Sequence, residues 1–136
     1  MNHIIRAATP KDLPFLAAND IHIGPSEREN VLRQGRILLL EQDGHPVGWL
    51  RWGMFWDNMP FMNLLFLLDG FRGIGLGRAL VEHWERLMRS QGHAMVMTST
   101  QANEEAQHFY RRLGYRDVGG FVLPDEPLEL ILIKQL

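Results

Sequence analysis

Three glycines stand close together in the segment LLFLLDGFRGIGLGRALVEHW, which covers residues 64–84. An apolar run precedes Gly73, Gly75 and Gly77, and a segment with helical spacing follows them. A glycine-rich turn between a strand and a helix directs backbone N–H groups, and the positive end of the helix dipole, toward one point. Because glycine has no Cβ, a phosphate can approach this backbone closely. The segment therefore predicts an anion site, although turn glycines that bind nothing give the same pattern.

Two familiar phosphate-binding motifs fit this segment badly. A Walker-type loop requires Gly-Lys followed by Ser or Thr, whereas Gly77 is followed by Arg78 and Ala79. A dinucleotide fingerprint requires an acidic residue about 20 positions further on, and the corresponding segment HAMVM contains none. The sequence therefore gives little support for binding of ATP or NAD through the glycine turn.

A second group of spaced residues follows later in the chain. It reads Asn103-x-x-Ala106-x-x-Phe109-Tyr110-x-x-x-Gly114-Tyr115. The earlier pattern, Arg72-x-x-Gly75-x-Gly77, resembles the acyl-coenzyme A pyrophosphate loop of the GNAT superfamily of N-acetyltransferases. The second block is similar to that family's other signature, in which an asparagine after the fifth strand begins a helix that ends in a glycine and an aromatic residue. The resemblance covers essentially the whole chain.

The resemblance implies a mixed α/β (α+β) fold, with a GNAT-like central mixed sheet of about seven strands and about four flanking helices. It also implies that the fourth and fifth strands, near residues 61–68 and 94–100, splay apart and admit the pantetheine arm of the coenzyme. Unpaired amides at a splayed edge are costly unless a ligand satisfies them. No linker or repeat interrupts the sequence, so we expect a single N-acetyltransferase domain over residues 1–136.

Apolar periodicity and turn residues predict the order strand, two helices, three strands, helix, strand, helix, two strands. Pro10 should begin the first helix, and Ser26 with Glu29 should cap the second. Asp43-Gly44 is typical of a tight hairpin turn between antiparallel strands. The continuous apolar run FMNLLFLL suits a strand that is covered on both faces.

The resemblance also implies the site residues. The backbone near Leu67 and Leu68 should hydrogen-bond the thioester carbonyl and stabilise the oxyanion that develops on it, and Leu67 is a predicted catalytic residue together with Tyr110. Acetyl-CoA is the implied cosubstrate. The predicted cofactor-binding residues are Phe66, Leu67, Leu68, Arg72, Gly73, Ile74, Gly75, Leu76, Gly77, Arg78, Asn103, Ala106 and Tyr110.

Tyr110 stands at the family's tyrosine position, where the phenol would protonate the departing thiolate. The alternative is a core aromatic residue whose hydroxyl is satisfied locally. By the same resemblance Asn103 would hydrogen-bond the coenzyme arm, and it could equally be an ordinary helix N-cap.

The proton acceptor is not evident from the sequence. Some members of the family use a glutamate on the fourth strand, but the corresponding residue here is Asn63, which cannot accept a proton at working pH. Glu41, Asp125 and Glu129 could act through a water molecule, although each is better interpreted as a solvated or structural carboxylate.

Composition excludes several other functions. With 14 basic and 16 acidic side chains the formal net charge is −2, so no basic stripe is expected to bind nucleic acid. The chain has no cysteine, and its six histidines lack ligand spacing, so we expect no metal site. The start of the sequence does not resemble a signal peptide, and no apolar run is long enough to cross a bilayer. We therefore expect a cytoplasmic protein without a membrane partner.

The resemblance to the GNAT superfamily thus implies an N-acetyltransferase that moves an acetyl group from acetyl-CoA to a primary amine of a small molecule, peptide or protein. The alternative is a noncatalytic acyl-CoA sensor or interaction module on the same fold. Five aromatic residues around the third strand could line an acceptor pocket, belong to the core or form the face of a homodimer: Trp49, Trp52, Phe55, Trp56 and Phe61.

Overall fold

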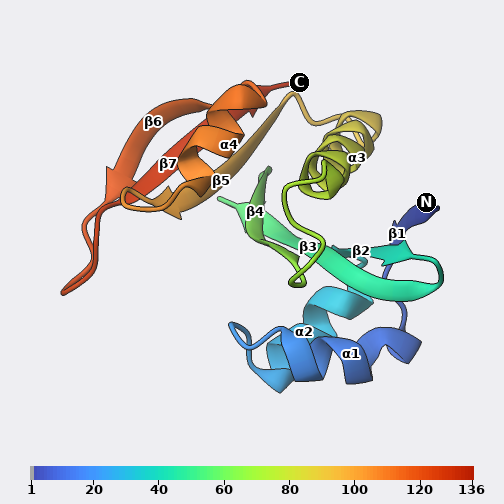
Figure 1. The fold of residues 1–136 in the computed structure, drawn as a ribbon. Helices are drawn as coiled ribbons and strands as arrows, with labels where there is room; N and C mark the ends of the chain where they lie inside the picture. The colour runs from blue at the N-terminus through green and yellow to red at the C-terminus, as the bar shows by residue number, and fades with distance from the viewer. Residues whose placement is uncertain (1) are drawn as a thin grey trace. The chain divides into compact units, whose positions relative to one another are not determined.

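The computed structural model describes residues 2–136, and it confirms the predicted order of elements. The elements are β1 (His3–Ala7), the 3-10 helix η1 (Pro10–Asp12), α1 (Leu13–Asn19), α2 (Pro25–Arg33), β2 (Ile37–Gln42), β3 (His45–Phe55), β4 (Met59–Leu67), α3 (Leu76–Ser90), β5 (Met95–Gln101), α4 (Ala106–Arg112), β6 (Arg116–Phe121) and β7 (Glu129–Gln135) (Figure 1).

The seven strands form one mixed sheet in the order β1-β2-β3-β4-β5-β7-β6, which confirms the predicted α/β fold. Within residues 2–136 the parallel pairing of β4 with β5 is confined to Phe61 with Met97 and Met62 with Thr98. Two strands that separate at one end pair over only a few residues, as β4 and β5 do here. Backbone contacts divide the chain into two compact units, residues 1–53 with 64–84 and residues 54–63 with 85–136. Both β4 and α3 contribute residues to each unit.

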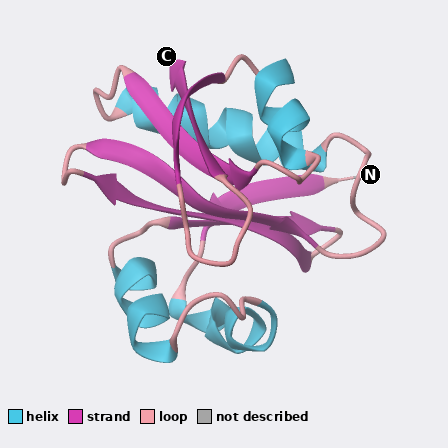
Figure 2. Cartoon of the chain, turned by 90° about the vertical axis from the view of Figure 1, so that its left-hand side faces the viewer, coloured by secondary structure: helices cyan, strands magenta, loops and turns pink. Residues whose placement is uncertain are grey.

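In the first unit, α1 and α2 lie on one face of strands β1 to β3 (Figure 1 and Figure 2). A buried cluster joins these helices to the strands, and it includes Leu16, Leu32, Leu39 and Trp49. The Trp49 ring also packs against Phe66 of β4, with ring centroids 5.1 Å apart. Apolar burial of this kind is the main source of folding free energy, so the cluster fixes the end of β4 against β3.

A buried ion pair anchors the segment between α1 and α2. Asp20 is 1% exposed, and its carboxylate accepts hydrogen bonds from Arg51 Nε at 2.9 Å and from Trp49 Nε1 at 3.2 Å. Arg28 Nη2 donates to the backbone carbonyls of Asp20 and Ile23, at 3.0 and 3.1 Å. Because a buried charge without a partner is very unfavourable, this network holds the segment in one conformation.

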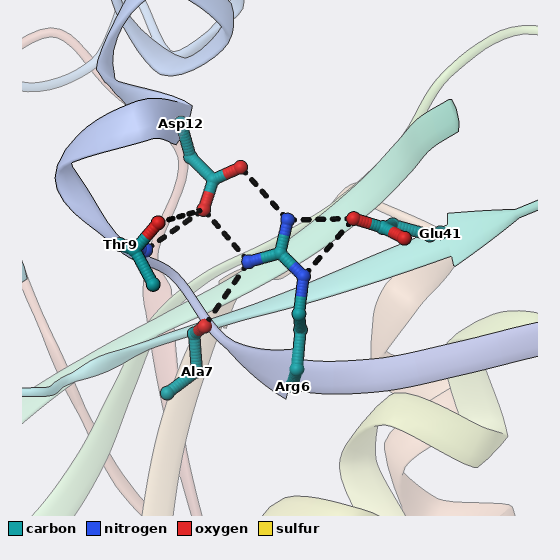
Figure 3. A network of polar contacts seen from close by, with 5 residues as sticks. All are labelled: Arg6, Ala7, Thr9, Asp12 and Glu41. Carbon is teal, nitrogen blue, oxygen red and sulfur yellow. Dashed lines mark hydrogen bonds and ion pairs between the residues drawn. The ribbon is translucent and has the colours of Figure 1, made fainter. Parts of the chain in front are cut away.

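A second polar network joins β1, η1 and β2 (Figure 3). The Arg6 guanidinium donates to both carboxylate oxygens of Asp12, at 2.7 and 2.9 Å, and to Glu41 Oε1 at 2.6 and 3.0 Å. Asp12 Oδ2 also accepts the Thr9 backbone N–H at 2.7 Å, which closes the start of η1. The network therefore uses Glu41, one of the carboxylates considered above as a proton acceptor, for structure.

The Asp12 carboxyl should make stability depend on acid pH. Its hydrogen bonds with Arg6 lower its pKa from the ordinary value of 3.8. A carboxyl whose pKa is lower in the folded state contributes its full stabilisation above the unfolded-state pKa and loses it as the pH falls through the folded-state pKa. We expect Asp12→Asn to lower the free energy of unfolding by about 1.5–3 kcal/mol at pH 7. Urea unfolding should show this difference shrinking below about pH 4, and a difference that stayed constant down to pH 2 would contradict the assignment.

In the second unit, β5, β7 and β6 form an antiparallel ladder, with β5 paired to β7 over Met95–Gln101. Helix α4 lies against these strands in Figure 1. The side chain of Glu85, from the last turns of α3, accepts hydrogen bonds from Tyr115 Oη and Lys134 Nζ, both at 2.9 Å. Burial, and then the charge of Glu85, raise the pKa of Tyr115. The pair with Lys134 compensates the buried carboxylate and ties α3 to β7.

Two local predictions differ from the structure. Helix α2 begins at Pro25 with Gly24 as its N-cap, so the predicted cap at Ser26 is wrong, because proline at the first helical position starts the helix earlier. Strand β4 is also less covered than its apolar sequence suggests. Asn63 is exposed and residues 64–67 are half-buried, so this strand is not closed on both faces within the described chain.

Candidate active site

At the end of β4, the side chains pack against the core and the backbone groups of successive residues point to opposite edges of the strand. Leu64, Phe66 and Leu68 pack against the buried cluster of the first unit. The Leu68 backbone N–H donates to the Val47 carbonyl of β3 at 2.8 Å. Because successive residues of an antiparallel strand direct their backbone groups to opposite edges, the N–H and C=O of Leu67 point away from β3. The amides of Leu67 and Leu68 are the two predicted to face the thioester. The Leu68 amide is bonded to β3, whereas the Leu67 amide is directed away from that strand.

Gly48 of β3 lets the end of β4 approach closely. A Cβ on Gly48 would meet the Leu67 side chain and would lie 3.0 Å from the Phe66 carbonyl oxygen. Gly48 was not among the predicted site residues. A glycine between Val47 and Trp49 in the predicted strand was the available signal, because a glycine inside a strand often marks a close backbone approach.

Arg72 folds back onto the end of β4. Its Nε donates to the Leu67 carbonyl oxygen at 2.9 Å, and its guanidinium lies 4.9 Å from the centre of the Phe66 ring. A weaker ion pair joins it to Asp69 at 3.8 Å. The structure thus brings together three of the predicted site residues, Phe66, Leu67 and Arg72, and gives the Leu67 carbonyl a charged hydrogen-bond donor.

The glycine turn leads directly into α3. Gly73 and Gly75 have φ angles of +73° and +90°, a backbone conformation that residues with a side chain rarely adopt. The Gly75 carbonyl accepts the Ala79 N–H at 3.1 Å, which is the first bond of the helical pattern. The N–H groups of Leu76, Gly77 and Arg78 therefore have no acceptor within the helix. A Cβ at Gly73 or Gly75 would meet nothing within 4 Å, so the space beside these glycines is open.

The charges around this turn favour an anion. No acidic residue lies in the first turn of α3, and Arg78 lies there, exposed and paired to Glu82 at 3.3 Å. Ile74 is exposed and Leu76 is buried beneath the turn. Exposed N–H groups, a helix dipole and a nearby arginine are the combination that binds phosphate groups.

The second signature lies in the second unit. Asn103 is exposed in the turn before α4, and Ala106 is the first residue of that helix. The N-cap of α4 is Glu105, so the alternative in which Asn103 caps the helix is wrong. Within the described residues, no hydrogen bond engages the Asn103 side chain.

Tyr110 is buried on α4, with 6% of its surface exposed. Its ring packs edge-to-face against Tyr115 and Phe109, at 5.6 and 5.2 Å. Burial, and to a smaller extent the charge of Glu104, raise the pKa of Tyr110 to about 12. The phenol is therefore protonated at neutral pH and is able to act as a proton donor.

Asn63, which stands where some family members carry a glutamate, is exposed on β4. Glu41 is held by Arg6, Asp125 lies in an exposed turn with φ 60°, and Glu129 is half-buried on β7. Among residues 2–136 no group of histidine, aspartate and glutamate side chains is arranged to hold a metal ion. None of the helices in that range is long and apolar enough to span a bilayer.

The aromatic residues around β3 divide into two sets. Trp49 and Trp52 are buried core residues, at 1% and 4% exposure. Trp56 is 78% exposed on the hairpin turn after β3, where it packs on Phe55 with ring centroids 4.9 Å apart. Phe55 in turn stacks on Phe61 at 6.1 Å. Core packing thus accounts for the two tryptophans that precede the turn.

Comparison with known proteins identifies the family. The model of the acetyltransferase (GNAT) family matches residues 5–115. An uncharacterized N-acetyltransferase from Methanocaldococcus jannaschii is 33% identical over 79 residues, which are 57% of this chain and 50% of that protein. The match thus spans about half the length of this curated relative.

Solved structures share the fold. Ard1 from Thermoplasma volcanium superposes with a TM-score of 0.86 at 18% identity, covering 100% of this chain and 99% of the other. Arabidopsis thaliana Naa50, in complex with the bisubstrate analogue CoA-Ac-MVNAL, superposes with a TM-score of 0.80 at 17% identity over 100% of both chains. Since the family model matches most of the sequence and the strand order and glycine turn agree with it, this chain belongs to the acetyltransferase (GNAT) family.

Proposed function

We propose that this protein is an N-acetyltransferase that moves the acetyl group of acetyl-CoA to a primary amine. The observation that carries the proposal is the turn from Gly73 to Arg78, whose outward N–H groups and open glycine faces suit a diphosphate. Membership of the acetyltransferase family supports the same reaction. We also propose that residues 1–136 act as one catalytic domain.

The residues present fit the cofactor. A side chain at Gly73 or Gly75 would fill the space beside the N–H groups. Because both residues are glycines, this space is open. We propose that the backbone from Gly73 to Gly77, with Arg78, binds the diphosphate. We further propose that Phe66, Leu67, Leu68, Arg72, Asn103 and Ala106 line the path of the coenzyme arm.

Acetyl-CoA supplies an acyl group that is activated as a thioester. Attack requires a neutral amine, and an alkylamine with a pKa of about 10.4 is only about 0.04% neutral at pH 7, so its extra proton must first pass to water. Transfer then forms the bond from nitrogen to the acyl carbon and breaks the bond from that carbon to sulfur, and the nitrogen loses a second proton to water. The Leu67 N–H, which points away from β3, would donate to the thioester oxygen.

Tyr110 would donate its phenolic proton to the departing sulfur and recover a proton from water. Because a thiol has a pKa of about 8.5, protonation of the sulfur aids departure modestly. A phenol with a pKa of about 12 keeps its proton until the sulfur develops negative charge. Burial thus keeps Tyr110 in the protonated form that a general acid requires, and it also makes the phenol a weaker acid than a solvated tyrosine.

Replacement of Tyr110 by phenylalanine should lower kcat by about tenfold or more, while the Kd for acetyl-CoA stays unchanged. The loss follows from removal of the proton donor without removal of the ring that packs on Tyr115. Stopped-flow release of CoA thiol and a separate binding titration measure the two quantities. The matched control is Tyr115→Phe, which removes the hydroxyl that donates to Glu85 and should affect stability rather than kcat. A kcat unchanged in Tyr110→Phe would remove Tyr110 from the mechanism.

A panel of acceptors tests the function itself. The structure of Naa50 was solved with the bisubstrate analogue CoA-Ac-MVNAL. Peptides with a free N-terminal amine are therefore the first acceptors to test. Polyamines, aminoglycosides and amino acids complete the panel. Thiol release that depends on the acceptor supports the proposal, and acetyl-CoA binding without turnover on any acceptor would favour a noncatalytic sensor.

A further inference from the structure

Arg28 is a buried arginine on α2 that uses only part of its hydrogen-bonding capacity. It is 7% exposed, and its Nη2 atom donates to the backbone carbonyls of Asp20 and Ile23. A guanidinium carries five N–H groups, so these two bonds leave three N–H groups without an acceptor within residues 2–136. One of the three belongs to Nε, which is sealed from solvent and has no hydrogen-bond partner. Buried donors of this kind are costly unless a ligand satisfies them.

The charge of Arg28 also lacks a partner. The carboxylate of its neighbour Asp20 is paired with Arg51, whose Nε lies 2.9 Å away. The acidic residues beside Arg28 on α2, Glu27 and Glu29, are exposed, and within the described chain no carboxylate forms an ion pair with Arg28. The buried side chains of Asp20, Arg28 and Arg51 therefore carry two positive charges and one negative charge. Because an unpaired buried charge is very unfavourable, this surplus favours an anion from outside the chain.

A ligand has access to this arginine. The segment between α1 and α2, which Arg28 holds, is exposed at Ile21, His22 and Gly24. A Cβ on Gly24 would meet nothing within 4 Å. Nη1 of Arg28 makes no hydrogen bond within the described residues, and unlike Nε it is not sealed from solvent. An anion can therefore reach the guanidinium through Nη1.

A series of contacts links this segment to the end of β4. The Asp20 carboxylate accepts the indole N–H of Trp49 at 3.2 Å. The Trp49 ring packs against Phe66, with ring centroids 5.1 Å apart. Phe66 directly precedes Leu67, whose N–H is proposed above to donate to the thioester oxygen. Arg28 thus belongs to the part of the structure that packs on the end of β4, where acyl transfer is proposed.

We propose that Arg28 binds a carboxylate of the acceptor, so that the protein prefers acceptors that carry a carboxylate as well as a primary amine. This inference rests on the proposed function and adds the chemical class of the acceptor. A carboxylate would accept charge-assisted hydrogen bonds from the guanidinium and would neutralise the surplus charge. An amino acid and the acidic side chain of a peptide both supply this group, at different distances from the amine.

A series of matched acceptors tests the preference. Each ω-amino acid from glycine to 6-aminohexanoate is compared with its neutral amide, and C-terminally amidated peptides with aspartate are compared with the same peptides carrying asparagine. We expect kcat/KM for the carboxylate to exceed that for the amide by about tenfold or more at one chain length or in one peptide. The arm that shows the preference identifies the source of the carboxylate. No preference in either arm would overturn the proposal.

Arg28→Met should remove this preference. The carboxylate lies away from the reacting atoms, so we expect the KM for the preferred acceptor to rise by about tenfold or more while kcat and the KM for acetyl-CoA stay unchanged. The matched control is Arg33→Met on the same helix, because Arg33 is exposed and donates only to the Asn30 side chain, at 3.0 Å, within residues 2–136. Arg33→Met should keep the preference. A preference that persisted in Arg28→Met would overturn the proposal.

Binding can also be followed without turnover and in the wild-type chain. This matters because Arg28→Met also removes the bonds to the Asp20 and Ile23 carbonyls and can unfold the segment. In ¹⁵N spectra of the arginine Nε–H groups, Arg28→Lys and Arg33→Lys each remove one resonance and so assign it. Titration with propionate, butyrate or hexanoate should shift the Arg28 resonance to saturation and leave that of Arg33 in place, whereas hexanamide should shift neither. An Arg28 resonance that no carboxylate shifts would overturn the proposal.

Failure of this inference differs from failure of the proposed function. If carboxylate and amide acceptors are acetylated equally well, the role of Arg28 falls and the proposed acetyl transfer stands. If no amine is acetylated, the transfer itself fails, and the role of Arg28 in choosing the acceptor is overturned with it.

Discussion

Gly75→Val should weaken acetyl-CoA binding by about 100-fold or more, because a side chain there would fill the space beside the N–H groups at the start of α3. Each hydrogen bond to a charged group contributes about 1.5–3 kcal/mol, so displacing a diphosphate from two of them is enough. A Cβ at Gly75 would meet no protein atom within 4 Å, so the added side chain would clash with the ligand rather than with the fold. Isothermal titration calorimetry measures the effect.

The control for this prediction is Gly70→Val. Gly70 has φ +88°, close to the +90° of Gly75, and it also has open space where a Cβ would lie. The two substitutions therefore impose similar backbone strain, but Gly70 precedes the phosphate motif. We expect Gly70→Val to retain binding. Equal losses in both variants would show that strain, and not exclusion of the ligand, explains the result.

Arg51→Met should destabilise the protein by about 3–5 kcal/mol, the usual cost of removing one partner of a buried ion pair. Asp20 is 1% exposed, and among residues 2–136 the Trp49 indole N–H is the one donor that would remain on its carboxylate in the variant. Methionine nearly fills the volume of arginine, so the loss reports the uncompensated charge more than a cavity. Chemical denaturation at pH 7 measures the change.

The matched surface pair is Arg111 with Asp117, joined by two hydrogen bonds at 2.9 and 2.8 Å. These side chains are 37% and 43% exposed, and water compensates either charge when its partner is removed. Arg111→Met should therefore leave the denaturation midpoint nearly unchanged. If both substitutions shifted the midpoint alike, burial would not explain the strength of the Asp20 pair.

Local patterns predicted the elements well, because their determinants lie within a few residues. The Asp43-Gly44 turn has positive φ at both positions, as its dipeptide indicates. The turn glycines at 73 and 75 likewise adopt the backbone that only glycine favours. The start of α2 was misplaced because two start signals, Pro25 and Ser26, stand side by side and the proline prevails.

Pairings between distant residues could not be predicted in the same way. Asp20 meets Arg51 across 31 positions, and Thr98 meets the Met62 carbonyl across 36. Neither pair has a spacing that identifies it, since Asp20 follows α1 and reaches Arg51 of β3 only in the folded chain, and the pairing of β4 with β5 brings Thr98 to Met62. The interaction of Arg72 with the Leu67 carbonyl was missed for another reason, namely that backbone acceptors leave no trace in residue types.

The proposed acetyl transfer is best tested by thiol release from acetyl-CoA in the presence of the acceptor panel, measured on the wild type beside Gly75→Val. We expect the wild type to release thiol in proportion to acetylated amine, and Gly75→Val to release almost none. Acceptor-dependent release that is equal in both proteins, or a wild type that neither binds acetyl-CoA nor acetylates any amine, would contradict it.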